Sequence, residues 1–396
     1  RPFFSRRIGL NDQGPVGILA GGKLTGRLGP FKFGALSTFI EHKDGVSERN
    51  LFVGRAAANV LGESTVGTIV TNGNPEGGPG STTVGLDFLY RDTSFLDGPD
   101  TVRASLWVAK SLNDNERGSQ RNHGYGIKLE YPQDLINWLL GFEELQEDYD
   151  PKLGFVNRND IRHWFGSFRY RTRPVSGPFR TIDQRLFGQV FLDSGNEVET
   201  INLRFTPAEF KTPIEDGFEF SYQIRHERVR TSFPVFDIPE STYSFHEGAI
   251  GFFTSRNRPL YAELELAYGT FFDGTRTSVD AGVEWRPSHF VLVQVEYEYR
   301  DVNLPTAGST AARNDRDTQL VRLRTTLQFS PDISWSTFVQ YDNVSDSAGV
   351  NSRLRWIVRD GREFFVVFNQ ALDTSTDDLR RERSEALVKA VWTFTF

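Results

Sequence analysis

Apolar and polar residues alternate along much of the chain with a period of two residues, and this feature most constrains what the chain can fold into. In residues 291–300 (VLVQVEYEYR), valine and tyrosine alternate with glutamine, glutamate and arginine. Successive side chains of a β-strand point to opposite faces, so this pattern predicts a strand with one apolar and one charged face. Similar segments recur at residues 84–91, 125–131, 218–225, 260–268, 279–286, 321–329 and 387–396.

Two classes of protein accommodate such strands. A mean hydropathy of −0.42 and 24% charged residues suit a soluble protein, and no stretch approaches the roughly 18 consecutive apolar residues of a membrane helix. Both values also suit a transmembrane barrel, in which only alternate residues meet lipid. The aromatic fraction of 13% favours the barrel, because aromatic girdles flank its lipid-facing band.

The connections provide a second indication, since short and long ones alternate. Short turns are predicted at residues 29–30, 132–133, 256–259, 287–288, 330–332 and 360–361, and longer polar loops at 113–122, 301–315, 343–349 and 373–380. Outer-membrane barrels have short periplasmic turns and longer extracellular loops. We therefore expect an all-β, transmembrane antiparallel β-barrel of about 22 strands (roughly 20–24), forming one domain over residues 1–396. Counting back from Phe396 puts the first strand at residues 3–10 and both chain ends in the periplasm.

The charged faces contain the candidate site residues. The acidic group comes from three successive predicted strands and comprises Glu263, Glu265, Asp280, Glu284, Glu296 and Glu298. The basic group follows it and comprises Arg322, Arg324, Arg353 and Arg355. If the barrel encloses water, these lumen-facing charges steer ions and polar solutes. The alternative, which we favour, is a network of cross-strand ion pairs that stiffens the wall. The two roles are compatible.

The last strand ends on an aromatic carboxyl terminus. Trp392, Phe394 and Phe396 lie on one face of this strand, an arrangement that resembles the signal recognised by the machinery that assembles outer-membrane barrels. We expect these three residues to act as an assembly signal and the strand to lie in the outer membrane.

The other chemistries find little support. The chain has no cysteine, and its six histidines are scattered singly without a zinc-binding spacing. Residues 113–116 (NDNE) lack the EF-hand spacing for calcium, and a net charge of −7 leaves no basic footprint for nucleic acid. We predict no enzyme, cofactor, metal site or nucleic-acid partner; an outer-membrane hydrolase is the less favoured alternative, because a Ser-His-Asp site assembles only in space.

Several stretches resemble a known family. Residues 1–4 (RPFF), 5–9 (SRRIG), 21–27 (GGKLTGR), 153–158 (LGFVNR), 354–357 (LRWI) and 364–369 (FFVVFN) are similar to a bacterial outer-membrane β-barrel domain of unknown function. In that family the barrel usually follows an amino-terminal domain similar to family-9 carbohydrate-binding modules. Here that domain is absent, and the first two motifs abut where the family has an intervening stretch.

These expectations lead to two functions. The first is a pore, or the membrane-embedded part of a transport system, for a polar solute. The second is a structural anchor or scaffold for a periplasmic domain or a surface complex. Barrels of about 22 strands are usually plugged, and the plug could come from the amino-terminal part, from an inward loop such as residues 301–315, or from a partner protein. Expected partners are outer-membrane lipid, the barrel assembly machinery, and a periplasmic or surface protein.

Overall fold

A computed structural model describes residues 2–11, 14–42, 48–95, 97–114, 120–230, 238–304, 315–376 and 380–393. The fold is all-β, apart from one turn of 3-10 helix (η1, Ser5–Arg7). Within the described residues no helix is long and apolar enough to cross a membrane. The chain divides into two compact units, of which the first holds residues 1–170 and 186–203 and the second holds residues 171–185 and 204–396.

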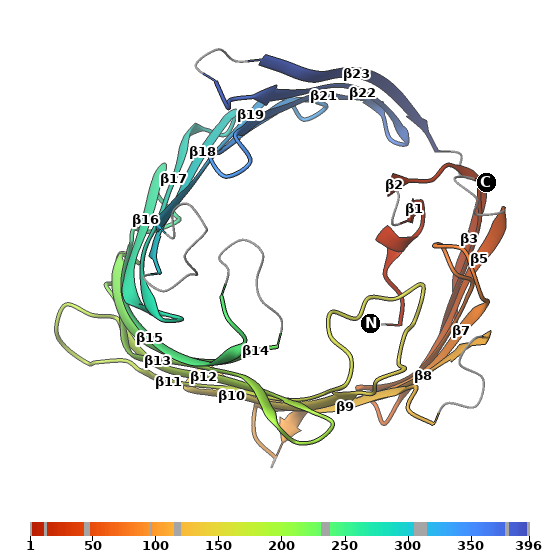
Figure 1. Cartoon of the computed structure of the whole chain (residues 1–396), viewed down its shortest axis with the longest axis horizontal. Coiled ribbons are helices and arrows are strands. Elements are labelled where there is room, and N and C mark those ends of the chain that lie inside the picture. The colour runs from red at the N-terminus through yellow and green to blue at the C-terminus, as the bar shows by residue number, and fades with distance from the viewer. Residues whose placement is uncertain are drawn as a thin grey trace. The chain divides into compact units, whose positions relative to one another are not determined.

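The first unit is built from antiparallel strands that pair in chain order from β3 to β11 (Figure 1). A separate two-stranded sheet, β1 with β2, precedes them. The strands are β1 (Leu10–Asn11), β2 (Gly14–Pro15), β3 (Ile18–Leu28), β4 (Phe31–Ile40), β5 (Arg49–Val60), β6 (Ser64–Asn72), β7 (Ser81–Phe95), β8 (Asp100–Asn113), β9 (His123–Pro132), β10 (Ile136–Leu145) and β11 (Ile161–Thr172).

The second unit repeats this plan, with antiparallel pairing in chain order from β14 to β23. Strands β11, β12 and β13 have residues in both units. The strands are β12 (Thr181–Asp193), β13 (Val198–Lys211), β14 (Gly217–Val229), β15 (Ser241–Phe253), β16 (Leu260–Phe271), β17 (Gly274–Ser288), β18 (Val291–Asn303), β19 (Asp315–Ser330), β20 (Ile333–Asp342), β21 (Ser347–Arg359), β22 (Arg362–Asp373) and β23 (Arg380–Trp392).

The all-β antiparallel prediction is confirmed, and the described strands β3 to β23 number 21, within the expected range. The predicted first strand at residues 3–10 is wrong, because η1 and Gly9, which has a φ of +80°, turn the backbone there. The predicted turn at residues 287–288 is also displaced, since β17 continues to Ser288 and β18 begins at Val291.

Connection lengths agree with the prediction better in the first unit than in the second. In the first unit, short turns at residues 29–30, 61–63, 96–99 and 133–135 alternate with longer connections at 41–48, 73–80, 114–122 and 146–160. In the second, the connection at 272–273 has only two residues, and the predicted loop at 343–349 is shorter because β21 starts at Ser347.

The pairing register gives most strands a mainly polar and a mainly apolar face. In the first unit, Leu86, Val108 and Tyr125 lie directly opposite one another on β7, β8 and β9, and they are 56%, 43% and 37% exposed. On the opposite face, Arg55 of β5 forms a bidentate ion pair with Asp87 of β7. We call the face that contains these charged residues the polar face and the other the apolar face.

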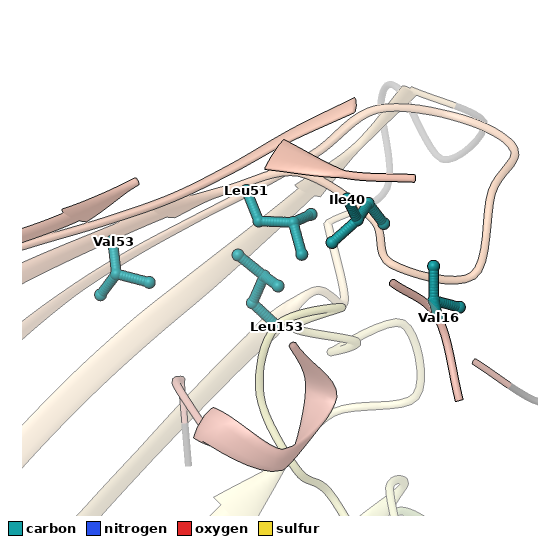
Figure 2. Close-up of a cluster of buried hydrophobic side chains, with 5 residues drawn as sticks. All are labelled: Val16, Ile40, Leu51, Val53 and Leu153. Carbon is teal, nitrogen blue, oxygen red and sulfur yellow. The ribbon is translucent and has the colours of Figure 1, made fainter. Parts of the chain in front are cut away.

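A buried apolar cluster lies on the polar face of the first unit. It contains Val16, Ile40, Leu51, Val53 and Leu153, and Figure 2 shows Leu153 directed toward Leu51 while Val16 lies beside Ile40. The amino-terminal arm, residues 2–17, and the loop at residues 146–160 thus meet over β4 and β5.

Polar and aromatic contacts join the same segments. The Phe4 amide donates to the Leu153 carbonyl at 2.8 Å, and the Phe4 and Phe155 rings are 5.4 Å apart. Arg7 forms an ion pair with Glu76 at 2.6 Å. In the same loop, burial raises the pKa of the Tyr149 hydroxyl, which is therefore neutral at all physiological pH values. The arm and the loop form one packed layer on the polar face.

Replacing Leu51 by alanine should loosen the arm. Leu51 is fully buried in the cluster, and truncation of such a leucine costs about 2–5 kcal/mol. Hydrogen exchange of the Phe4 amide, which bonds to Leu153, reports this change. The matched control is Leu61→Ala in the turn after β5, because Leu61 is 73% exposed. Equal protection of the Phe4 amide in both variants would contradict the packing role of Leu51.

Candidate functional site

The strand register gathers the acidic group on the polar face of the second unit. Glu265, Asp280 and Glu298 lie directly opposite one another on β16, β17 and β18. Glu263 and Glu296 flank Gly282 in the neighbouring row. Glu284, the sixth member, is buried and accepts a 2.6 Å hydrogen bond from the Gln294 amide. The six carboxylates predicted from alternation therefore share one face.

Five of these carboxylates line a pocket of about 440 Å³. Its charged and hydroxyl-bearing lining consists of Glu219, Tyr261, Glu263, Glu265, Asp280, Glu296, Tyr297 and Glu298. Two glycines make room for the longer side chains. A Cβ on Gly282 would lie 3.0 Å from Cγ of Glu263, and a Cβ on Gly251 would lie 3.2 Å from Cγ of Glu219. The pocket is therefore a hollow in the sheet surface in which glycines leave room for the side chains of neighbouring carboxylates.

Arginines bind most of the carboxylates in this pocket. Arg322 contacts Glu298 at 2.7 Å and Glu296 at 3.2 Å. Arg300 makes a bidentate contact with Asp280. The remaining contacts are those of Arg204 with Glu265 (3.2 Å) and Glu219 (3.4 Å), of Arg185 with Glu219, and of Arg256 with Glu263 (3.3 Å). The cross-strand ion-pair network that the sequence allowed is thus present on this face.

Several members of this network are not among the residues predicted from the sequence. Glu219 and Arg204 lie on β14 and β13, far in sequence from Glu265, which Arg204 contacts. Alternation alone places Glu219 on a polar face, beside Phe218 and Phe220, so its face was predictable. Its ion-pair partners were not, because the pairing of distant side chains depends on rotamers that a sequence pattern does not specify.

The basic group divides into paired and unpaired arginines. Arg322 belongs to the network above, and Arg355 forms a bidentate ion pair with Glu363. Arg324 and Arg353 make no ion pair within the described residues. Each lies over an aromatic ring instead, with Arg324 at 5.5 Å from the Phe338 centroid and Arg353 at 4.4 Å from that of Phe365. The four predicted arginines share the polar face but do not form one continuous group.

Of the three aromatic residues predicted as an assembly signal, Trp392 on β23 lies within the described residues. Trp392 lies opposite Arg362, whose guanidinium group is 3.7 Å from the centre of the indole ring. Lys389 lies opposite Phe365, on the polar face. Phe394 and Phe396 are outside the described residues, as is most of the loop at residues 301–315.

One histidine has an ordered polar environment. His163 on β11 lies 3.0 Å from a Glu143 carboxylate oxygen and 3.3 Å from the Gln189 amide oxygen. Its ring stacks on Phe191 with centroids 3.9 Å apart. Over the described ranges, no group of three or more His, Cys, Asp or Glu side chains is arranged to hold a metal ion. His163 is held in place by a carboxylate and a stacked ring, as a structural histidine of the sheet can be.

Neither a scan against protein-family models nor a search of curated proteins found a match for this chain.

The Arg300–Asp280 pair allows the network to be tested. Both side chains are partly exposed, at 30% and 39%, and partly exposed ion pairs contribute about 0.2–1 kcal/mol. A double-mutant cycle with Arg300→Gln and Asp280→Asn, followed by denaturant unfolding, should give a coupling energy in that range. The solvent-exposed Arg383–Glu385 pair, 3.6 Å apart, is the control and should couple more weakly. A coupling of zero for Arg300–Asp280 would show that the pair does not stiffen the sheet.

Proposed function

We propose that this chain is a bacterial outer-membrane β-barrel that acts as a pore, or as the membrane-embedded part of a transport system, for a polar solute. The observation that carries the proposal is that, along most of the sheet, exposed apolar side chains and charged side chains lie on opposite faces of the same strands, although the Glu144–Arg162 ion pair lies on the apolar face. It fits the resemblance to a family of outer-membrane barrel domains, and it assigns the chain no catalytic step and no cofactor.

The apolar face argues for contact with lipid. In the second unit, Val283, Val295 and Leu323 lie directly opposite one another on β17, β18 and β19, and they are 44%, 40% and 37% exposed. Soluble proteins rarely expose contiguous apolar patches larger than a few hundred Å². Each Å² of such surface costs roughly 25 cal/mol in water. A bilayer removes this cost along every strand.

Contact with lipid also favours closure of the sheet into a barrel. In lipid, an open sheet edge would leave backbone N–H and C=O groups unsatisfied, so spanning sheets close on themselves. Hairpin-linked strands alternate in direction, so the first and last of 21 run the same way. We therefore propose that β3 and β23 pair in parallel, whereas the sequence had favoured about 22 strands, an even number.

Cysteine crosslinking can test this closure, because the chain has no cysteine of its own. Leu24 on β3 is replaced by cysteine and combined with single cysteines at positions 386, 388 and 390 on β23. Parallel pairing predicts that Leu24→Cys forms a crosslink with a cysteine in the carboxyl-terminal half of β23, at position 386, 388 or 390. It predicts no crosslink to a cysteine at the amino-terminal end of β23, such as position 381. Crosslinks to position 381 alone, or to no position, would rule out the parallel closure.

The polar face would then line a water-filled interior. The acidic pocket and the unpaired arginines provide regions of opposite charge, and such regions select ions by sign. The proposed partners are the lipid around the apolar face, the assembly machinery that would bind the terminal aromatic residues, and a periplasmic or surface protein.

Planar-bilayer recording tests the pore directly. The purified chain should conduct, and the variant Glu296→Gln/Glu298→Gln should shift selectivity toward anions, because it removes two negative charges and releases Arg322 from both of its partners. A control is Glu363→Gln, which releases only Arg355 and should produce a smaller shift. The absence of any conductance would reject the open-pore form of the proposal.

A structural anchor is the second candidate, and the layer formed by the arm and the loop favours it. That layer covers part of the polar face of the first unit, and it is fastened there by the apolar cluster and by the Arg7–Glu76 ion pair. A barrel that is blocked in this way could hold a periplasmic domain or a surface complex without conducting.

Shortening the loop separates the two candidates. Replacing residues 150–157 by a short Gly-Ser linker removes Leu153 and its contacts with the arm. If the layer is a plug in a conduit, conductance should rise severalfold over that of the unmodified chain. A linker of the same composition in the turn at residues 61–63 is the control and should leave conductance unchanged. Silence in both variants, with normal membrane insertion, would favour the anchor.

A further inference from the structure

We propose that Arg324 and Arg353 form a binding subsite for an oxyanion, the carboxylate or phosphate group of a small solute, on the polar face of the second unit. The inference rests on the proposed function in one respect only, namely that the polar face is in contact with water. It does not require that the chain conducts.

The charged groups on this face are not all paired with one another. On this face the acidic group is bound by arginines, and Arg322 and Arg355 are bound by carboxylates. Arg324 and Arg353 are exposed and make no ion pair within the described part of the chain. Lys389, two strands from Arg355, is exposed as well. The local excess of charge is therefore positive, although the chain as a whole carries a net charge of −7.

Aromatic rings hold both guanidinium groups in position. Phe338 lies directly opposite Arg324 in the register, and the Phe365 ring, only 8% exposed, lies beneath Arg353. A guanidinium that stacks on a ring keeps its N–H groups at its edge, where they can bind an oxyanion through two parallel hydrogen bonds. The rings are neutral, so they fix each cation without cancelling its charge.

The surface between the two arginines carries no charged side chain. Ser336, Phe338 and Asn351 occupy the polar face of the intervening strand and its neighbour, with Ser336 directly opposite Arg353 and Asn351 directly opposite Phe338. These residues carry no charge, and Asn351 donates to Asn369 on the next strand. Neighbouring carboxylates are bound by other arginines: Glu363 by Arg355, Glu385 by Arg383, and Glu296, which lies diagonal to Arg324, by Arg322. An incoming anion would meet hydrogen-bonding groups and no free carboxylate.

The spacing indicates the size of the solute. Arg324 on β19 and Arg353 on β21 are separated by one strand, and neighbouring strands lie about 4.8 Å apart, so the two backbone positions are roughly 10–12 Å apart. Long arginine side chains can converge from that distance on one anionic group, or each can bind one end of a short dianion. The subsite therefore fits a compact solute that carries one or two oxyanions.

Titration of the detergent-solubilised full chain tests the subsite without any need for conductance. Inorganic phosphate and succinate are the two probes, and isothermal titration calorimetry at low salt is the measurement. Saturable binding of either probe is expected, and it should weaken at least about tenfold in Arg324→Gln/Arg353→Gln, because charge-assisted hydrogen bonds are lost. The control is Arg355→Gln/Glu363→Gln, which removes a paired arginine together with its carboxylate and leaves the net charge unchanged, and it should retain binding within about twofold.

The two probes distinguish the sources of the anion. Binding of phosphate alone assigns the subsite to phosphate groups, whereas binding of succinate alone assigns it to carboxylates. A second variant, Phe365→Leu, keeps both charges but removes the ring under Arg353, and it should weaken binding by a smaller factor than the double arginine variant. The absence of saturable binding of both probes, or equal weakening by the control variant, would overturn the proposal. If the chain binds a probe but does not conduct, the subsite stands and the open pore fails; if it conducts without binding, the reverse holds.

Discussion

The backbone register between neighbouring strands is the constraint on which the other features of this molecule depend. Side chains on a strand alternate between faces, so a slip of one residue would move every charged group of that strand to the apolar face. The register that aligns Glu265, Asp280 and Glu298 also aligns Leu264, Ala281 and Tyr297 on the other side. Once the pairing is set, the distribution of charge and of apolar surface follows without any further choice.

Given this register, the charges differ in what they do. Carboxylates on β16 to β18 are close enough to arginines on β13, β18 and β19 and in the turn before β16 to form a network, and such pairs mainly resist deformation of the sheet. The arginines above Phe338 and Phe365 have no such partner among the described residues, so their charge is available to a solute. Structural and binding roles, which the sequence presented as alternatives for one set of residues, are divided between different members of that set.

The sequence predicted the faces of the strands well because their information is local. A period of two residues places Glu296, Arg322 and Arg353 on one side regardless of what they contact. It failed at residues 3–10, where Ser5–Arg7 form a helical turn and Gly9 has a φ of +80°, since a few alternating residues resemble a short strand. It also could not find the contact of Leu153 with Leu51 or that of Arg204 with Glu265. Those depend on which distant segments meet, and one sequence carries no pattern for that.

The docking of the amino-terminal arm has a consequence for the order in which the protein is built. All the contacts described for the arm, from the Arg7–Glu76 pair to the packing of Val16 and Leu153, are made with residues before position 156. A growing chain therefore possesses every partner of the arm well before its terminal strand has been synthesised. The arm can pack early on the polar face of the first unit, so that part of this face is already covered when the last strands are added.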